Sequence, residues 1–320
     1  MLLDILYIVI GIVLVLKGAD YLTEGASSLA RRMKVPEIVI GLTIVAAGTS
    51  APELFVSIMS ALKGTPDLAV GNVIGSNIFN SMLIVGCAAM VAPMVISPST
   101  VKKDMPFAVI ASLLLVVLCL DSFSSLSIVG NSISRIDGIL LLTGFAVFMV
   151  YTFRVAIKKG GNSESESGHE TMPAWKGILL VIIGLAGLVF GSNLFVSSAS
   201  DLAASLGVSE GVIGLTVVAG GTSLPELATS VVAARKCRSA IAIGNVIGSN
   251  VFNLLLILGI TAVICPMQIG GITMVDVCTM LVSMILVWAF SFTKYTVERW
   301  EGALLTILFF GYMGWLLYNL

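Results

Sequence analysis

The chain has 320 residues, of which 58% are hydrophobic and 11% are charged, and its formal net charge is −1. Since a soluble domain carries about 25% charged residues, this composition predicts a membrane protein with little chain left for a soluble domain. A net charge near zero provides no basic field for nucleic acid, and the single histidine, His169, lies in a polar stretch, which excludes histidine relays inside the membrane.

Apolar runs follow one another along the chain, each close to the roughly 20 residues that a membrane-spanning helix needs. They lack the alternation of apolar and polar residues that is typical of barrel strands, so we expect helices. In chain order the predicted helices are 5–30, 37–62, 69–96, 105–120, 137–153, 175–203, 210–234, 242–265, 272–292 and 300–319. The sequence therefore predicts an all-α membrane protein with ten transmembrane helices.

The longest polar segment, 154–173, is rich in Gly, Ser and Glu and is typical of a flexible linker. It separates a first half, 1–153, from a second half, 174–320, with five predicted helices in each. Shifting the sequence by 173 residues aligns the halves without a gap, and 38 of the 76 positions from 18 to 93 are identical to their partners. Such identity indicates an internal duplication.

An odd number of helices per half means that the second half enters the membrane from the opposite side, so we expect inverted repeats. Basic residues test this, because loops rich in Lys and Arg stay in the cytoplasm. If the loops alternate, 14 basic residues fall on one side and two, Lys63 and Arg135, on the other. The side with 14 basic residues is then cytoplasmic and carries the linker 154–173. We therefore expect a cell-membrane protein with both termini on the outer side.

Two motifs recur in both halves at the repeat spacing. The first is GTSAPE at 48–53 and GTSLPE at 221–226, and the second is GNVIGSNIFN at 71–80 and GNVIGSNVFN at 244–253. Lipid-facing positions would diverge faster than this after a duplication, so we expect both motifs to face inward. The GxxxG spacing in each second motif also predicts close helix packing.

The first motif combines a helix break with oxygen ligands. Pro52 lacks an N–H and displaces the carbonyl four residues earlier, so we expect free backbone oxygens near Gly48 and Thr49, and the same near Thr222. Inside a membrane such carbonyls are tolerated where they line a cavity or meet a cation. Hydroxyl and carboxylate groups follow each break, and this oxygen-only set favours Ca²⁺ or Na⁺ over zinc or copper.

Glu53 and Glu226 are the acidic residues that lie deep in apolar runs and recur in both halves. A carboxylate inside a membrane costs several kcal/mol unless it is compensated, which favours a functional role. Two carboxylates would neutralise one Ca²⁺ or two Na⁺, so we expect the two ions to exclude each other. Asp20 does not recur, and we expect it to be solvated or paired, for example with Lys17.

The second motif supplies further oxygens. Ser76 and Asn80 are four residues apart, as are Ser249 and Asn253, so each pair lies on one helix face and can point at one centre. Four other asparagines fit interhelical hydrogen bonding and ion coordination equally well, namely Asn72, Asn77, Asn245 and Asn250.

These paired motifs resemble the alpha-repeats of the Ca²⁺/cation antiporter superfamily, in particular prokaryotic sodium/calcium exchangers. The resemblance covers residues 10 to 320 and implies a core formed by the second, third, seventh and eighth helices, with no cofactor other than the transported Ca²⁺ and Na⁺. It implies that Glu53 and Glu226 bind Ca²⁺. The other ligands that it implies for Ca²⁺ and Na⁺ are Thr49, Thr222, Ser50, Ser223, Ser76, Ser249, Asn80, Asn253, Ala46 and Ala219, and the threonines and alanines among them bind through their carbonyls.

The function that the resemblance implies is alternating-access exchange of Na⁺ for Ca²⁺, with three Na⁺ per Ca²⁺ and hence a response to voltage. Position 253 is Asn, whereas K⁺-dependent relatives have Asp there, so we expect exchange without K⁺. The alternatives are an H⁺-coupled Ca²⁺ antiporter and a cation channel. An intramembrane hydrolase is disfavoured because no base is placed beside a serine. The oligomeric state is left open.

Overall fold

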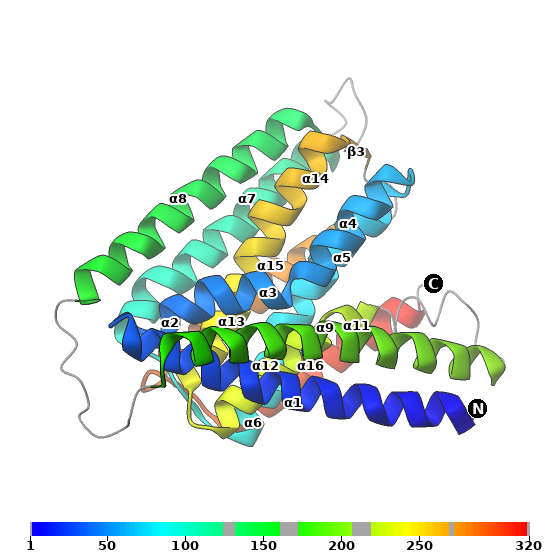
Figure 1. Cartoon of the computed structure of the whole chain (residues 1–320). Helices are drawn as coiled ribbons and strands as arrows, with labels where there is room; N and C mark the ends of the chain where they lie inside the picture. The colour runs from blue at the N-terminus through cyan, green and yellow to red at the C-terminus, as the bar shows by residue number, and fades with distance from the viewer. Residues whose placement is uncertain (1, 124–131, 161–171, 207–218, 269–271, 319–320) are drawn as a thin grey trace.

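The computed structural model describes residues 2–123, 132–160, 172–206, 219–268 and 272–318, and within these ranges the chain is almost entirely helical (Figure 1). The first half contains α1 (Leu2–Arg32), α2 (Glu37–Ile40), η1 (Gly41–Val45), α3 (Ala46–Thr49), α4 (Ala51–Leu62), α5 (Pro66–Ile78), η2 (Phe79–Ile84), α6 (Val85–Val91), β1 (Met94–Val95), η3 (Thr100–Asp104), α7 (Met105–Phe123), β2 (Ser132–Ile133) and α8 (Arg135–Gly160), where η denotes a π-helical stretch.

The second half repeats this order in its described part. It contains α9 (Ala174–Ser205), α11 (Ala219–Thr222), α12 (Leu224–Arg235), α13 (Ser239–Val251), η5 (Phe252–Ile257), α14 (Leu258–Ile264), β3 (Met267–Gln268), α15 (Met274–Phe290), β4 (Thr296–Val297) and α16 (Arg299–Tyr318). Six described helices are long and apolar enough to cross a membrane alone, and the bent pair from Glu37 to Leu62 makes a seventh span.

The described helices follow the predicted ones closely, with three differences. The third predicted helix, 69–96, ends at Val91, because Pro93 cannot continue a helix, and Met94 and Val95 form strand β1 instead. Helix α8 continues to Gly160, past the predicted end at 153, because the residues that follow include several good helix formers despite their charge. The linker 154–173 therefore begins as helix, and its central part lies outside the described residues. Residues 210–218 of the seventh predicted helix also lie outside them.

The duplication is visible in the element boundaries. Helix α5, the π-helical stretch η2 and helix α6 each begin and end 173 residues before α13, η5 and α14. Each π-helical stretch begins within the repeated second motif. Its backbone hydrogen bonds span five residues, whereas those of an α-helix span four. Repeated sequence has thus produced the same irregularity twice, at the same position in each half.

Helices α1 and α9 are equivalent in the repeat and lie side by side (Figure 1). Glycines pair across their contact, namely Gly11 with Gly191, Gly18 with Gly184, and Gly25 with Gly177. Residue numbers fall along α9 as they rise along α1, so the helices are antiparallel. Two equivalent helices that run in opposite directions are what an inverted repeat requires.

This glycine seam brings the two backbones into direct contact. A Cβ atom at Gly18 would lie 2.7 Å from the carbonyl oxygen of Gly184, and one at Gly184 would lie 2.6 Å from the backbone nitrogen of Leu22. A Cβ cannot be accommodated at such distances without moving a helix. The absence of side chains at these positions is therefore a packing requirement.

The α5–η2–α6 and α13–η5–α14 segments form the centre of the molecule. In the most apolar 18-residue stretch of each segment, 72% and 78% of the residues are buried. The corresponding share is 28% in both α1 and α9 and 22% in both α8 and α16. Every residue from Ile241 to Val251 of α13 is buried. Polar groups on these central helices consequently face protein and not lipid.

Close packing of the second motif differs between the halves. In the second half a Cβ at Gly248 would lie 2.6 Å from that of Ala46, so the predicted close approach occurs against η1 and α3. In the first half a Cβ at Gly71 or Gly75 would meet nothing closer than 4.0 Å among the described residues. The residues equivalent to η1 in the second half lie outside the described ranges.

Two short antiparallel ladders join the halves, since β1 pairs with β4 and β2 pairs with β3. Ion pairs also join them. Lys236 Nζ lies 2.6 Å from Asp20 Oδ1, and Arg238 Nη1 lies 3.0 Å from Glu37 Oε1, which also accepts a hydrogen bond from Ser27. Asp20 is paired, as expected, but its partner is Lys236 and not Lys17, because the end of α12 brings Lys236 to that face of α1.

We predict that Gly184→Ala lowers the stability of the purified protein by about 1–3 kcal/mol, because the new methyl group forces α9 away from α1. Thermal unfolding in detergent measures the change. Gly314→Ala on α16 is the matched control, since a Cβ there meets nothing within 4 Å. Equal stability of the two variants would contradict the packing role of the seam.

Candidate ion-binding site

The site begins with a break in the second transmembrane segment. Helix α3 ends at Thr49, α4 begins at Ala51, and the axis bends by 46° between them. Ser50 at the break has φ −84° and ψ 8°, and Pro52 occupies the first turn of α4, where its missing N–H is tolerated. The predicted break is confirmed at this position.

The same break occurs in the second half, where Ser223 between α11 and α12 has φ −90° and ψ 8°. A serine that precedes a helix normally caps it with its own hydroxyl. Neither Ser50 nor Ser223 makes such a bond. Both hydroxyls are thereby available to the opposite repeat.

Each break places a carboxylate in the first turn of the helix that follows. Glu53 and Glu226 are both 1% exposed, and neither has an ion-pair partner among the described residues. Backbone N–H groups at a helix N-terminus carry partial positive charge, which stabilises a carboxylate there. The two breaks therefore create a local environment in which buried negative charge is tolerable.

Serine hydroxyls cross between the repeats to reach these carboxylates. Ser50 Oγ donates to Glu226 Oε1 at 2.9 Å, and Ser223 Oγ donates to Glu53 Oε1 at 3.1 Å. Helices α5 and α13 add one serine each. Ser76 Oγ lies 3.3 Å from Ser223 Oγ, and Ser249 Oγ lies 3.5 Å from Glu226 Oε1.

Two asparagines hold the broken helices against the central ones. Asn72 Nδ2 lies 3.3 Å from the carbonyl oxygen of Glu53 and 3.0 Å from Ser57 Oγ. Asn245 makes the equivalent bonds to Glu226 and to Ser230, with the same two distances. For these two asparagines the geometry favours interhelical hydrogen bonding over ion coordination.

Among the buried side-chain oxygens without a hydrogen-bond partner in the described residues are four on predicted ligands, namely Glu53 Oε2, Glu226 Oε2, Asn80 Oδ1 and Asn253 Oδ1. Each belongs to a residue that the sequence predicts to bind ions. Buried polar atoms without a partner are rare, because each costs about 1–3 kcal/mol. Hard, unpartnered oxygens contributed equally by two repeats fit Ca²⁺ or Na⁺.

The other predicted ligands lie around this centre. Thr49 is buried, and its hydroxyl donates to Asn245 Oδ1 at 3.1 Å. The carbonyl of Ala46 accepts the Ser50 N–H at 3.0 Å, and the Thr49 hydroxyl lies 3.4 Å from the same oxygen. In the second half Thr222 is half-buried at the end of α11, and Ala219 is the first residue of that helix that the structure describes.

Sequence reasoning missed Ser57 and Ser230, which anchor Asn72 and Asn245. Both recur at the repeat spacing of 173, so the duplication carried a signal for them. It also missed Ser81, which accepts a hydrogen bond from Asn250 Nδ2 at 2.9 Å. Position 254, the equivalent of Ser81, is Leu, so no recurrence could have identified that residue.

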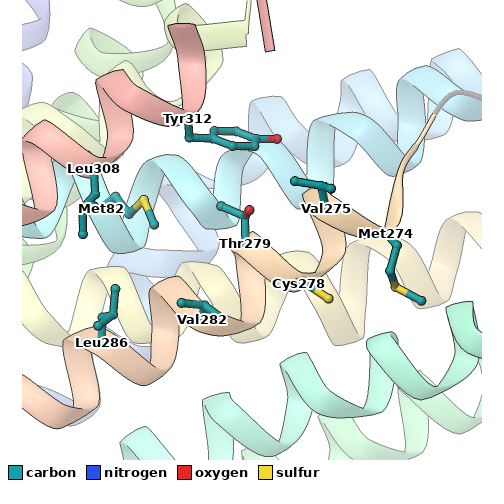
Figure 2. Close-up of a pocket in the computed structure, with 9 residues that line it drawn as sticks. All are labelled: Met82, Met274, Val275, Cys278, Thr279, Val282, Leu286, Leu308 and Tyr312. Carbon is teal, nitrogen blue, oxygen red and sulfur yellow. The ribbon is translucent and has the colours of Figure 1, made fainter. Parts of the chain in front are cut away.

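A separate cleft of about 440 Å³ lies between α15 and α16, with Met82 of η2 on its wall (Figure 2). Its lining is apolar except for groups such as Thr279 and Tyr312, and the Tyr312 hydroxyl donates to Asp276 at 2.7 Å. None of the predicted ion ligands lines it. The cleft is therefore distinct from the ion site.

The sequence matches the profile of the sodium/calcium exchanger protein family over residues 3–154 and 176–318. The chain belongs to the sodium/calcium exchanger family. It is thus a multi-pass membrane protein and a cation antiporter of that family, not an enzyme. The match spans both halves and leaves out most of the polar linker between them.

Relatives of this exchanger match over nearly its whole length. It is 35% identical to the putative antiporter CaxA of Alkalimonas amylolytica, over 98% of both chains. It is 33% identical to the sodium/calcium exchanger MaX1 of Methanosarcina acetivorans, over 98% of this chain and 99% of that one. The inner membrane protein YrbG of Escherichia coli is 36% identical over 84% of this chain and 82% of its own.

The fold of this exchanger matches solved structures of the sodium-calcium exchanger NCX_Mj. One of them, soaked with Na⁺ and Ca²⁺, superposes with a TM-score of 0.84 over 98% of both chains, at 29% sequence identity. This match confirms the predicted all-α membrane fold of two inverted five-helix repeats.

We predict that Asn245→Ala costs about 1–3 kcal/mol of stability, because it leaves Ser230 and the Glu226 carbonyl without their donor. Asn72→Ala removes the equivalent bonds at a half-buried position, where water can replace them, and its cost is expected to be smaller. Thermal unfolding of both variants in detergent gives the comparison. A larger loss for Asn72→Ala would contradict this interpretation.

Proposed function

We propose that this protein exchanges Na⁺ for Ca²⁺ across the cell membrane by alternating access, without K⁺. The observation that supports the proposal best is the set of four unpartnered buried oxygens on Glu53, Glu226, Asn80 and Asn253. Their position at the contact between inverted repeats suits a site that opens to one side at a time. MaX1 is named as a sodium/calcium exchanger, which supports the same coupling here.

In the proposed mechanism Ca²⁺ binds between the two glutamates, with the carbonyls of Thr49 and Thr222 completing its shell. Na⁺ binds in positions flanked by serine hydroxyls and the carbonyls of Ala46 and Ala219, with the asparagines at the centre. Two carboxylates balance one Ca²⁺ or two Na⁺, so occupation by one ion displaces the other. A third Na⁺ would leave one net positive charge, which makes exchange sensitive to voltage.

We infer that the pair α1 and α9 moves as a unit across the central helices. Helix α1 packs along α12, whereas α9 has no comparable contact with the equivalent helix α4. The ion pair of Asp20 with Lys236 adds to the first contact, and the pair of Glu37 with Arg238 joins α2 to the start of α13 beside it. Basic residues gather at the C-terminal end of α12, which we therefore place at the cytoplasmic side. Because α1 packs against α12 there, we infer that the site is closed toward the cytoplasm.

We predict that proteoliposomes loaded with Na⁺ take up Ca²⁺ when diluted into choline medium, and that Glu53→Gln and Glu226→Gln each abolish uptake. Each substitution removes half of the negative charge that binds the cation. Glu24→Gln is the control, because Glu24 is an exposed carboxylate on α1, and it is expected to transport normally. Radioactive Ca²⁺ measures the initial rate.

Uptake without internal Na⁺, or uptake that survives both glutamine substitutions, would contradict the proposal. Ca²⁺ flux driven by a pH jump in the absence of Na⁺ would instead indicate H⁺ coupling. Flux that needs no counter-ion at all would indicate a channel. The same vesicles serve all three measurements.

We further propose that both termini lie outside and that the turn between α12 and α13 faces the cytoplasm. Cys237 in this turn is exposed, so a membrane-impermeant maleimide is expected to label it in inside-out vesicles and not in intact cells. Cys237→Ser identifies the labelled site. Labelling of Cys237 in intact cells would reverse the orientation.

A further inference from the structure

The four asparagines near the centre form two pairs that are related by the duplication. Asn80 pairs with Asn250 across the repeats, and the equivalent pair is Asn253 with Asn77. In the first pair Asn80 Nδ2 donates to Asn250 Oδ1 at 3.0 Å. In the second pair Asn77 Oδ1 and Asn253 Oδ1 both lack a hydrogen-bond partner. Identical residues are therefore arranged differently on the two sides.

A short relay continues from the first pair. Asn250 Nδ2 lies 2.9 Å from Ser81 Oγ, and Ser81 Oγ lies 3.9 Å from Met284 Sδ. Asn250 Nδ2 also lies 3.7 Å from the same sulfur. The side chains of Asn80, Asn250, Ser81 and Met284 are at most 2% exposed, so no water competes for these bonds.

The second side has no such relay. The residue equivalent to Ser81 is Leu254, which offers no hydroxyl to Asn77. Asn77 Nδ2 instead donates to the carbonyl of Val73 in its own helix, at 2.7 Å. The amide of Asn253 consequently lacks the partner that Asn250 provides for Asn80.

We propose that Ser81 and Asn250 are positioning residues that orient the Asn80 amide so that its Oδ1 is presented to the transported cation. This inference rests on the proposed function of the site. It implies that Asn80 and Asn253 are unequal ligands: the first is held in one orientation before the ion arrives, and the second is oriented only by the ion.

The direction of the relay follows from the chemistry of its groups. An amide has one donor end and one acceptor end, so binding the donor end of Asn80 leaves its oxygen for the ion. Asn250 must present its oxygen to Asn80, which requires an acceptor for its own N–H groups. Ser81 is that acceptor, because its hydrogen is directed to Met284. Without Ser81 the side-chain amide of Asn250 can rotate by half a turn and exchange its oxygen and nitrogen. The amide of Asn80 then rotates as well, and its oxygen no longer faces the ion.

The test uses the full chain purified in detergent and titrated by calorimetry with CaCl₂ and, separately, with NaCl. Ser81→Ala is expected to raise the dissociation constant of at least one of the two cations by about tenfold. Ser81→Thr keeps the hydroxyl and is expected to stay within about twofold of the native value. Leu254→Ala is the matched control at the equivalent position, with native affinities expected.

Native affinities for both cations in Ser81→Ala would overturn the proposal, as would an equal loss in Leu254→Ala or a failure of Ser81→Thr to restore binding. Thermal unfolding of each variant identifies losses that come from unfolding alone. Ca²⁺ uptake by the same proteins after reconstitution into proteoliposomes separates the two hypotheses. Native protein that binds Ca²⁺ but shows no Na⁺-driven uptake contradicts the proposed coupling, while the calorimetry still decides the role of Ser81.

Discussion

Two carboxylates buried inside a membrane, with no basic partner among the described residues, are the constraint on which the rest of this structure depends. Glu53 and Glu226 would be prohibitively costly in an ordinary apolar helix. The breaks at Ser50 and Ser223 place each glutamate in the first turn of a new helix. A serine hydroxyl from the opposite repeat donates to the Oε1 atom of each glutamate. The remaining oxygens have no hydrogen-bond partner, and in the proposed function a transported cation compensates them.

The duplication supplies this arrangement twice, and the inversion brings the two copies face to face. The contacts that matter most therefore cross between halves: serine to glutamate, asparagine to asparagine, and glycine to glycine along α1 and α9. Departures from the symmetry are as informative as the symmetry. Lys236 pairs with Asp20, whereas the equivalent of Asp20 is Asn193, which carries no charge. Such differences allow two related ends of one core to behave differently.

Most of the fold could be predicted because hydrophobic length, basic loops and internal identity are properties of the sequence itself. The break at Ser50 was predictable from Pro52, and the clustering of Glu53 and Glu226 from their recurrence. The pairing of Asp20 was not, since the distance between segments is set by packing. The relay through Ser81 was hidden for another reason. Ser81, Asn250 and Met284 lie on three different helical elements, and the position equivalent to Ser81 is a leucine.

The hydrogen bond from Ser50 to Glu226 joins residues that are 176 positions apart in the chain. During synthesis Ser50 and Glu53 therefore enter the bilayer before Ser223 and Glu226 are made. Until then the first half has one of the two carboxylates and lacks the Ser223 hydroxyl that donates to it. The proposed site can therefore form only after the second half has joined the first in the membrane.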